Sequence, residues 1–122
     1  MSRRILVVED QQDNRQILRD LLTNNGFDVV EAEDGQSGVI AAKTQRPDLI
    51  LMDIQLPVLD GYEATRQIKS DPNLKAIPII VVTSYALSGD DRKAHDAGCD
   101  AYVTKPFSPR ALLAKIREFL PN

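Results

Sequence analysis

Five short apolar runs recur along the chain, and each is followed by a longer segment with helical periodicity. The runs cover residues 5–8, 27–30, 49–52, 77–82 and 101–103. Short runs rich in aliphatic and β-branched residues predict buried strands, whereas apolar residues three and four apart predict helices. Strands that alternate with helices form a parallel sheet that is covered on both faces. The pattern therefore predicts an α/β fold with five parallel strands and five helices.

The first two helical segments differ in how clearly they are marked. The stripe expected to face the core in the first segment consists of Ile17, Leu18, Leu21 and Leu22. Gly26 follows as a C-cap residue that ends this helix. The second helix is expected at about residues 36–45, where Gly38 weakens the pattern.

Two later helices carry recognisable start signals. Asp60 and Glu63 resemble a capping box that opens the third helix, in which Ala64 and Ile68 are expected to face inward. Ser108 and Pro109 read as the N-cap and first residue of the last helix. Its expected buried stripe consists of Leu112, Leu113, Ile116, Phe119 and Leu120.

The fourth helix, expected within residues 86–98, has little with which to anchor itself. The apolar side chains in "SGDDRKAHDAG" are Ala94 and Ala97, and burial of two alanines stabilises far less than burial of a leucine stripe. We expect this element to be the least firmly docked. It is then either a switch element or simply an exposed helix.

Length and composition limit the classes of function. A chain of 122 residues with a net charge of −3 fits one domain, expected to span residues 1–122, and it lacks the basic excess of nucleic-acid-binding proteins. The apolar runs are too short for a signal peptide or a membrane span, so a cytoplasmic location is expected. The single Cys99 is expected to fill the core in a reducing compartment.

Polar and charged side chains stand where the apolar runs end. They are Glu9, Asp10, Asp53, Thr83 and Lys105. Because the carboxyl ends of parallel strands lie along one edge of the sheet, these side chains are expected to meet there. Three neighbouring carboxylates repel one another unless a cation joins them, and Mg²⁺ takes oxygen ligands of this kind. With a lysine and a hydroxyl beside it, the cluster favours phosphoryl chemistry, in which an aspartate can be the nucleophile.

The chain lacks the sequence signatures of related phosphatase, nucleotide-binding and flavin-binding proteins. Haloacid dehalogenase-like phosphatases need a second aspartate two residues after the nucleophile, where this chain has Gln55. The glycines are not spaced as in a nucleotide-binding phosphate loop. The segment "EDQQDN" after the first run does not have the composition of a flavin-binding loop.

The motifs "VVED", "LILMDIQLPVLDG", "VVTS" and "YVTKPF", in this order, resemble the receiver domain of two-component response regulators. The resemblance covers essentially the whole chain and is strongest to free-standing receivers of the chemotaxis and DivK-like cell-cycle types. "MDIQLP" also resembles receivers fused to hybrid kinases. The resemblance implies a flavodoxin-like sheet with strand order 2-1-3-4-5.

The resemblance also implies a role for each residue of the cluster. Asp53 would be the phosphoacceptor, and Lys105 would pair with carboxylate or phosphoryl oxygens. Mg²⁺ would be bound by Glu9, Asp10, Asp53 and the backbone carbonyl of Gln55.

A conformational switch follows from the same resemblance. Thr83 would hydrogen-bond the phosphoryl group, and Tyr102 would move into the space that Thr83 vacates. The peptide bond between Lys105 and Pro106 would be cis, and Tyr85 would shield the phosphoryl group from water.

The resemblance further implies partners and a limited chemistry. A histidine kinase or histidine phosphotransfer protein would be the donor, and a downstream protein would bind the face made by the fourth helix, fifth strand and fifth helix. The chain would act as a monomer or a phosphorylation-dependent dimer, without direct contact to nucleic acid or membrane. It would not be a conventional enzyme, since it would catalyse only its own phosphorylation and dephosphorylation. A receiver-shaped module that binds partners without phosphorylation stays open, and Mg²⁺ affinity distinguishes the two.

Overall fold

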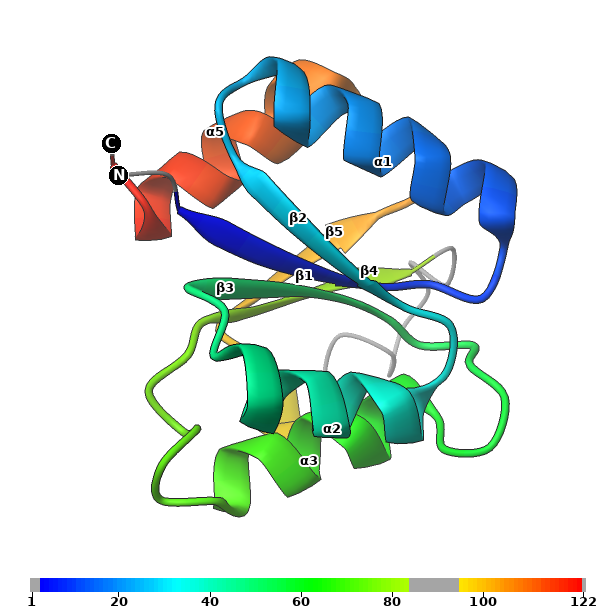
Figure 1. Ribbon diagram of the computed structural model, residues 1–122, viewed down its shortest axis with the longest axis vertical. Helices are drawn as coiled ribbons and strands as arrows, with labels where there is room; N and C mark the ends of the chain where they lie inside the picture. The colour runs from blue at the N-terminus through cyan, green and yellow to red at the C-terminus, as the bar shows by residue number, and fades with distance from the viewer. Residues whose placement is uncertain (1–2, 84–94, 122) are drawn as a thin grey trace.

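A single parallel sheet forms the centre of the protein, whose computed structural model describes residues 3–83 and 95–121 (Figure 1). The strands are β1 (Arg4–Val8), β2 (Asp28–Ala32), β3 (Leu49–Asp53), β4 (Ile79–Thr83) and β5 (Ala101–Thr104). Their order is β2-β1-β3-β4-β5, and all neighbouring strands run parallel. The predicted strand order is therefore confirmed, and the apolar runs lie within two residues of the observed strands.

Helices cover both faces of the sheet (Figure 1). Helices α1 (Gln12–Asn24) and α5 (Pro109–Phe119) lie on one face, and α2 (Gly35–Gln45) and α3 (Gly61–Ser70) lie on the other. Residues 95–97 are also helical. Most of the predicted fourth helix, including Ala94, lies outside the described residues. Ala97, the other alanine on which its weak docking was argued, is described and is buried. No helix of the described part is long and apolar enough to cross a membrane.

Alternating side chains of the strands build two hydrophobic cores. The core beneath α1 and α5 contains Ile5, Val7, Leu49, Leu51, Ile80 and Val82. The core beneath α2 and α3 contains Leu6, Val8, Ile50, Met52, Ile79 and Val81. Because both faces of the central strands are buried, these strands read as continuous apolar runs in the sequence.

Helix α1 departs from its prediction at Ile17, which is 60% exposed. The buried residues of this helix are Arg15, Leu18 and Leu22, which are spaced three and four apart and so share one helical face. Ile17 lies to one side of that face. The predicted stripe was therefore wrong at this position, and a buried arginine takes part in it instead.

The helix caps confirm most of the start signals. Ser108 caps α5 by accepting a hydrogen bond from the backbone N–H of Ala111, and Pro109 is the first helical residue. Asp60 accepts from the backbone N–H of Glu63 at 2.9 Å, but the Glu63 carboxylate pairs with Arg66 and does not return the bond. The predicted capping box is thus only half formed. A complete one, not foreseen, opens α2 between Asp34 and Ser37.

Candidate functional site

Three carboxylates meet at the carboxyl edge of the sheet. Oxygens of Glu9, Asp10 and Asp53 all lie within 4.8 Å of one another. Glu9 and Asp10 are the first two residues of the connection from β1 to α1, and Asp53 is the last residue of β3. Glu9 and Asp53 are 2% and 9% exposed, so the like charges are largely removed from water. The sequence prediction that strand ends bring these residues together is confirmed.

The alternation of side chains along the strands explains why Lys105 joins this group. Glu9, Asp53 and Lys105 continue the series of residues that faces α1 and α5. The Lys105 ammonium donates to Glu9 Oε1 at 2.9 Å and to Asp53 Oδ2 at 3.2 Å. Burial lowers the pKa of Lys105, but its hydrogen bond to Glu9 and the charges of Asp53 and Glu9 outweigh this effect. The pKa therefore stands above its ordinary value of 10.5, and the ammonium remains charged.

The turn after β3 fixes the carboxylate of Asp53 by a hydrogen bond from its own backbone. The other carboxylate oxygen of Asp53, Oδ1, accepts a hydrogen bond from the backbone N–H of Ile54 at 2.7 Å. The backbone N–H of Gly61 donates to the Ile54 carbonyl at 2.9 Å, and a Cβ at Gly61 would overlap the Asp53 carbonyl. The segment "LPVLDG" thus folds back under the end of the strand, and only glycine fits where it makes contact.

An acidic cleft of about 310 Å³ opens at this edge. Its lining consists of Glu9, Asp10, Gln11, Asn14, Asp53, Gln55 and Lys105. Carboxylate oxygens converging from separate chain segments are the donors that a hard divalent cation prefers. The donor set therefore fits Mg²⁺, which would remove the repulsion among the three carboxylates. Gln55 is exposed at the rim, where its backbone carbonyl was predicted to bind the metal.

The predicted switch residues lie on the opposite face of the sheet. Thr83, the last residue of β4, is 1% exposed and is not among the described residues that line the acidic cleft. Its position in the strand places it on the face of Val81, against which Tyr102 of β5 also packs. Thr83 is paired with Thr104, so Tyr102 is its diagonal neighbour.

Two further predictions concern the residues that follow β4 and β5. The peptide bond between Lys105 and Pro106 is cis, as predicted. Tyr85, predicted to shield the phosphoryl group, lies outside the described residues.

An apolar groove of about 400 Å³ adjoins the acidic cleft. Its lining consists of Glu9, Asn14, Ile17, Leu18, Lys105, Pro106, Phe107 and Pro109. Ile17, which is exposed and does not face the core, lines this groove. Glu9, Asn14 and Lys105 line both hollows, so the groove reaches the edge of the acidic cleft.

One functional candidate was missed at the sequence level. Arg15 is buried and donates from Nη1 to the carbonyl oxygens of Glu9 at 2.9 Å and Asp10 at 3.2 Å. The available signal was its spacing of three and seven residues before Leu18 and Leu22, which places it on the inward face of α1. A charged residue at such a position needs buried partners.

Comparison with known proteins agrees with the geometry of the site. The profile of the response regulator receiver domain matches residues 5–117. The polar-differentiation response regulator DivK of Brucella anthropi is 38% identical over 120 residues, which cover 98% of each chain.

Solved structures give the same result. The receiver domain of the sensor histidine kinase PA1611 from Pseudomonas aeruginosa PAO1, with a magnesium ion coordinated in its active-site cleft, is 38% identical. Its TM-score is 0.92, with 100% of both chains covered. A CheY-like receiver domain protein from Methanospirillum hungatei JF-1 is 31% identical with a TM-score of 0.92, covering 99% of this chain and 95% of that one. The chain described here therefore belongs to the response regulator receiver domain family.

Proposed function

We propose that this chain accepts a phosphoryl group on Asp53, with Mg²⁺ bound in the acidic cleft, from a phosphohistidine of a histidine kinase or histidine phosphotransfer protein. The observation that carries the proposal is the convergence of three carboxylates and Lys105 at one edge of the sheet. Membership of the receiver family supports it. So does the magnesium ion in the receiver domain of PA1611, which is 38% identical.

The residues around the cleft have different roles in the proposed reaction. Glu9, Asp10, Asp53 and the backbone carbonyl of Gln55 would hold Mg²⁺, which when bound offsets negative charge on the transferred phosphoryl oxygens. Lys105 offers a second positive charge. Its raised pKa keeps the ammonium protonated throughout the physiological range. Positive groups fixed in advance stabilise charge without having to reorganise during the reaction.

The transfer step itself uses one carboxylate oxygen of Asp53. That oxygen attacks phosphorus as the bond between phosphorus and the donor imidazole nitrogen breaks. The electron pair of the broken bond returns to the imidazole, and an aspartyl phosphate is formed. Later attack of water on phosphorus releases inorganic phosphate and restores the carboxylate. The chain therefore ends each cycle unchanged.

The apolar groove favours a protein as the phosphoryl donor. An exposed isoleucine beside half-buried Phe107 and exposed Pro106 offers apolar area at the edge of the acidic cleft. A small donor such as an acyl phosphate needs no such surface. A helical partner that presents a phosphohistidine would cover the groove as its phosphoryl group enters the cleft.

The output of the switch is proposed to pass through Thr83 and Tyr102 to a downstream protein. Their diagonal relation on neighbouring strands supports this route, because a shift of one side chain changes the space available to the other. The face proposed for the downstream contact includes β5, α5 and the predicted fourth helix. Phosphorylation would add roughly two negative charges and three acceptor oxygens at the end of β3, and the Thr83 hydroxyl at the end of the neighbouring β4 would hydrogen-bond one of these oxygens.

Intact mass after incubation with acetyl phosphate and Mg²⁺ tests the proposal. One phosphoryl adduct is expected for the wild type, and none for Asp53→Asn or when a chelator removes Mg²⁺. The chain has no tryptophan, so mass is a more direct readout than intrinsic tryptophan fluorescence. If no adduct forms and beryllofluoride also fails to bind, the phosphorylation-independent interaction module becomes the better description.

A further inference from the structure

The connection between β1 and α1 carries two of the three carboxylates of the acidic cleft, yet it has no side-chain cap where the helix begins. Gln11 is the N-cap residue of α1, and its side chain makes no capping hydrogen bond. Loops that position metal ligands need such fixed points, since a displaced ligand binds its metal less tightly. Arg15, one turn into the helix, reaches back to supply the fixed point.

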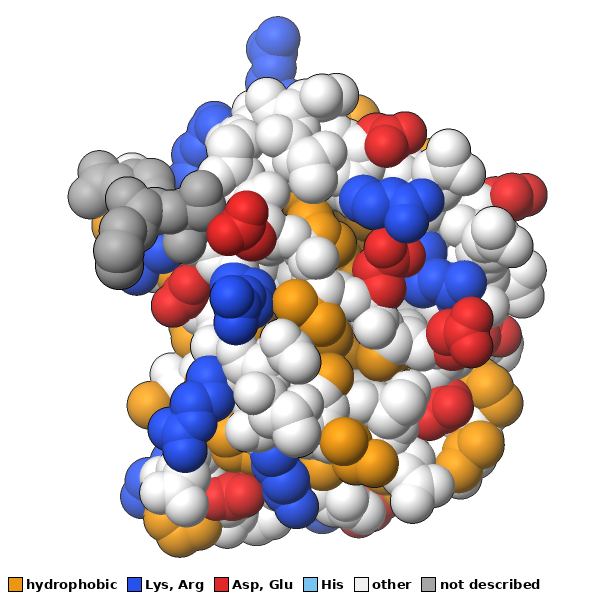
Figure 2. Space-filling view, viewed as in Figure 1, with side chains coloured by type: hydrophobic (Ala, Val, Ile, Leu, Met, Phe, Trp, Pro, Cys, Tyr) orange, Lys and Arg blue, Asp and Glu red, His pale blue; other side chains and the backbone are white. Residues whose placement is uncertain are grey.

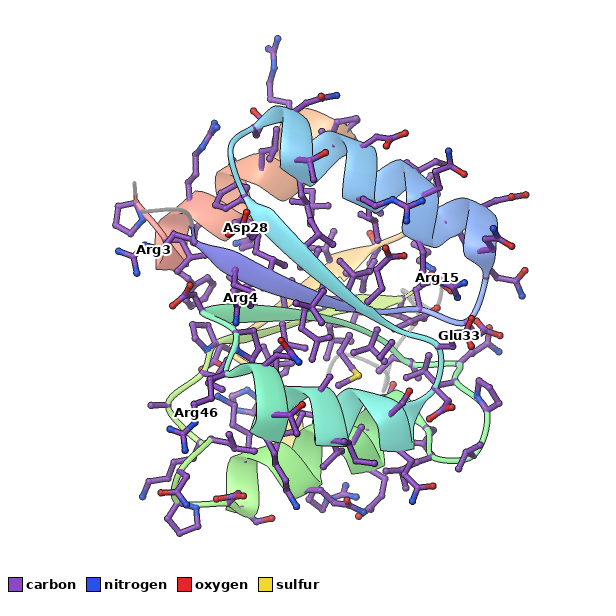
Figure 3. All side chains as sticks on the ribbon, in the orientation of Figure 1. Arg3, Arg4, Arg15, Asp28, Glu33 and Arg46 are labelled. Atoms are coloured by element: carbon purple, nitrogen blue, oxygen red, sulfur yellow. The ribbon has the colours of Figure 1, made fainter. Side chains whose placement is uncertain are left out.

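The guanidinium of Arg15 binds the connection between β1 and α1 and, at the same time, two carboxylates at the end of β2. Its Nη1 donates to the carbonyl oxygens of Glu9 at 2.9 Å and Asp10 at 3.2 Å. Its Nε lies 3.4 Å from Glu31 Oε1, and its Nη2 lies 3.2 Å from Glu33 Oε1. Figure 3 shows Arg15 and Glu33 next to each other, where α1 meets the end of β2. The arginine thus ties the connection to the neighbouring edge strand.

A single peptide group links Arg15 to a carboxylate of the acidic cleft. The peptide between Asp10 and Gln11 accepts from Arg15 through its carbonyl, and its N–H donates to Glu9 Oε2 at 3.1 Å. In a trans peptide the carbonyl and the N–H point in opposite directions. By fixing the carbonyl, Arg15 therefore also aims the N–H at the Glu9 carboxylate. The other oxygen of that carboxylate accepts from Lys105.

The charges around Arg15 favour a role through orientation over one through its own charge. The carboxylates of Glu31 and Glu33 offset the guanidinium, and Arg19 pairs with Glu31 at 2.9 Å. Figure 2 shows acidic and basic side chains alternating on this part of the surface. Two positive and two negative groups leave no net charge there to attract or repel a cation. Arg15 therefore affects the acidic cleft by fixing the orientation of the peptide between Asp10 and Gln11.

We infer that Arg15 is a positioning residue for the Mg²⁺ site, which it keeps in binding geometry through the peptide between Asp10 and Gln11. This inference rests on the proposed function, because it concerns the same cleft. A lysine cannot replace the arginine. Its single ammonium lacks the planar fork that serves two carbonyls and two carboxylates at once.

Magnesium titrations of the full chain, followed by calorimetry and by amide NMR shifts, test the inference. Arg15→Lys and Arg15→Met are each expected to raise the dissociation constant for Mg²⁺ about 10-fold, the lower end of the loss seen when groups that orient metal ligands are removed. Arg19→Met is the matched control. It removes another arginine that binds Glu31 but does not contact the connection, so its affinity is expected to match the wild type.

A second readout separates positioning from a general loss of stability. The rate of hydrogen exchange at the Gln11 amide, measured in chelator, is expected to increase in both Arg15 variants. The increase should exceed what their loss of unfolding free energy, measured in urea, accounts for. If Arg15→Met does not fold, Arg15→Lys decides.

The possible failures point to different conclusions. A Mg²⁺ affinity within twofold of the wild type in Arg15→Lys would overturn the positioning role, even if the variant were less stable. A wild-type chain that does not bind Mg²⁺ would overturn the proposed function together with this inference.

Discussion

The Lys105 ammonium lies 3.2 Å from Asp53 Oδ2, although the two residues are 52 positions apart in the sequence. The same ammonium lies 2.9 Å from Glu9, so one cation bridges two carboxylates from the ends of two other strands. This arrangement exists because β1 and β4 flank β3 in the sheet and β5 lies next to β4. Parallel strands bring their carboxyl ends together whatever the distance along the chain.

The raised pKa of Lys105 predicts a specific dependence of stability on pH. A group whose pKa is higher in the folded state stabilises the fold fully below its unfolded pKa, here 10.5, and loses this contribution as pH rises through the folded value. Wild type and Lys105→Met, unfolded by urea in chelator, are therefore expected to differ by a constant free energy from pH 7.5 to about 9.5. The difference should shrink at higher pH. A difference that grew above pH 10.5 would have the wrong sign.

Removal of Mg²⁺ is expected to lower stability, since the cation binds only the folded cleft. At a Mg²⁺ concentration 100 times the dissociation constant, the free energy of unfolding should be about 2.7 kcal/mol higher than in chelator. Asp10→Asn should lose most of this gain. Asp13→Asn should keep it, because Asp13 is an exposed acid in the first turn of α1 and does not line the acidic cleft. Equal losses in the two variants would show that the gain comes from general charge screening.

The apolar groove predicts a separation between protein and small-molecule donors. Ile17→Asp should slow transfer from autophosphorylated histidine kinases of the same organism at least 10-fold, roughly 1.4 kcal/mol of lost contact. Labelling by acetyl phosphate should stay unchanged. Ile40→Asp is the matched control, since Ile40 is 53% exposed but belongs to α2 on the other face of the sheet. Equal slowing in both variants would contradict a docking role for the groove.

Thr65 offers a test of the core beneath α3. Its hydroxyl is buried and has no hydrogen-bond partner among the described residues. Thr65→Val keeps the shape and removes the unpaired polar atom, so the free energy of unfolding should rise by about 1 kcal/mol. Thr44→Val removes an exposed hydroxyl that is bonded to the Ile40 carbonyl, and it should bring no such gain. Urea denaturation checks both. Destabilisation by Thr65→Val would show that the hydroxyl is bonded in solution.

Most of the fold could be predicted because its strands and helices are marked by local patterns of apolar and capping residues. The strand runs are continuous because central strands are buried on both sides, and the start of α5 is written locally in Ser108 and Pro109. The carboxylates and Lys105 were found for a similar reason. Each stands one or two residues after such a run, and strand order alone brings them together.

What sequence reasoning missed depends on contacts across the chain. Periodicity alone did not separate Ile17 from its buried neighbour Leu18, because adjacent residues of a helix lie only about 100° apart. Arg15 was not singled out, because its partners Glu31 and Glu33 come only after α1 has ended, at and beyond the end of β2. Lys69 is similar. It donates to the carbonyls of Lys75 and Ile77 and to the Asp100 carboxylate, and it thereby ties α3 to the starts of β4 and β5.

Reductive trapping of the phosphorylated protein would locate the modified residue directly. Borohydride converts an aspartyl phosphate to homoserine, which tandem mass spectrometry can place in a peptide. After treatment with acetyl phosphate and Mg²⁺, homoserine is expected at position 53, with no homoserine at position 10, no hydroxynorvaline at position 9, and neither product in a chelator control. Trapping at another residue, or no trapping when intact mass shows a phosphoryl adduct, would contradict the assignment of Asp53 as the phosphoacceptor.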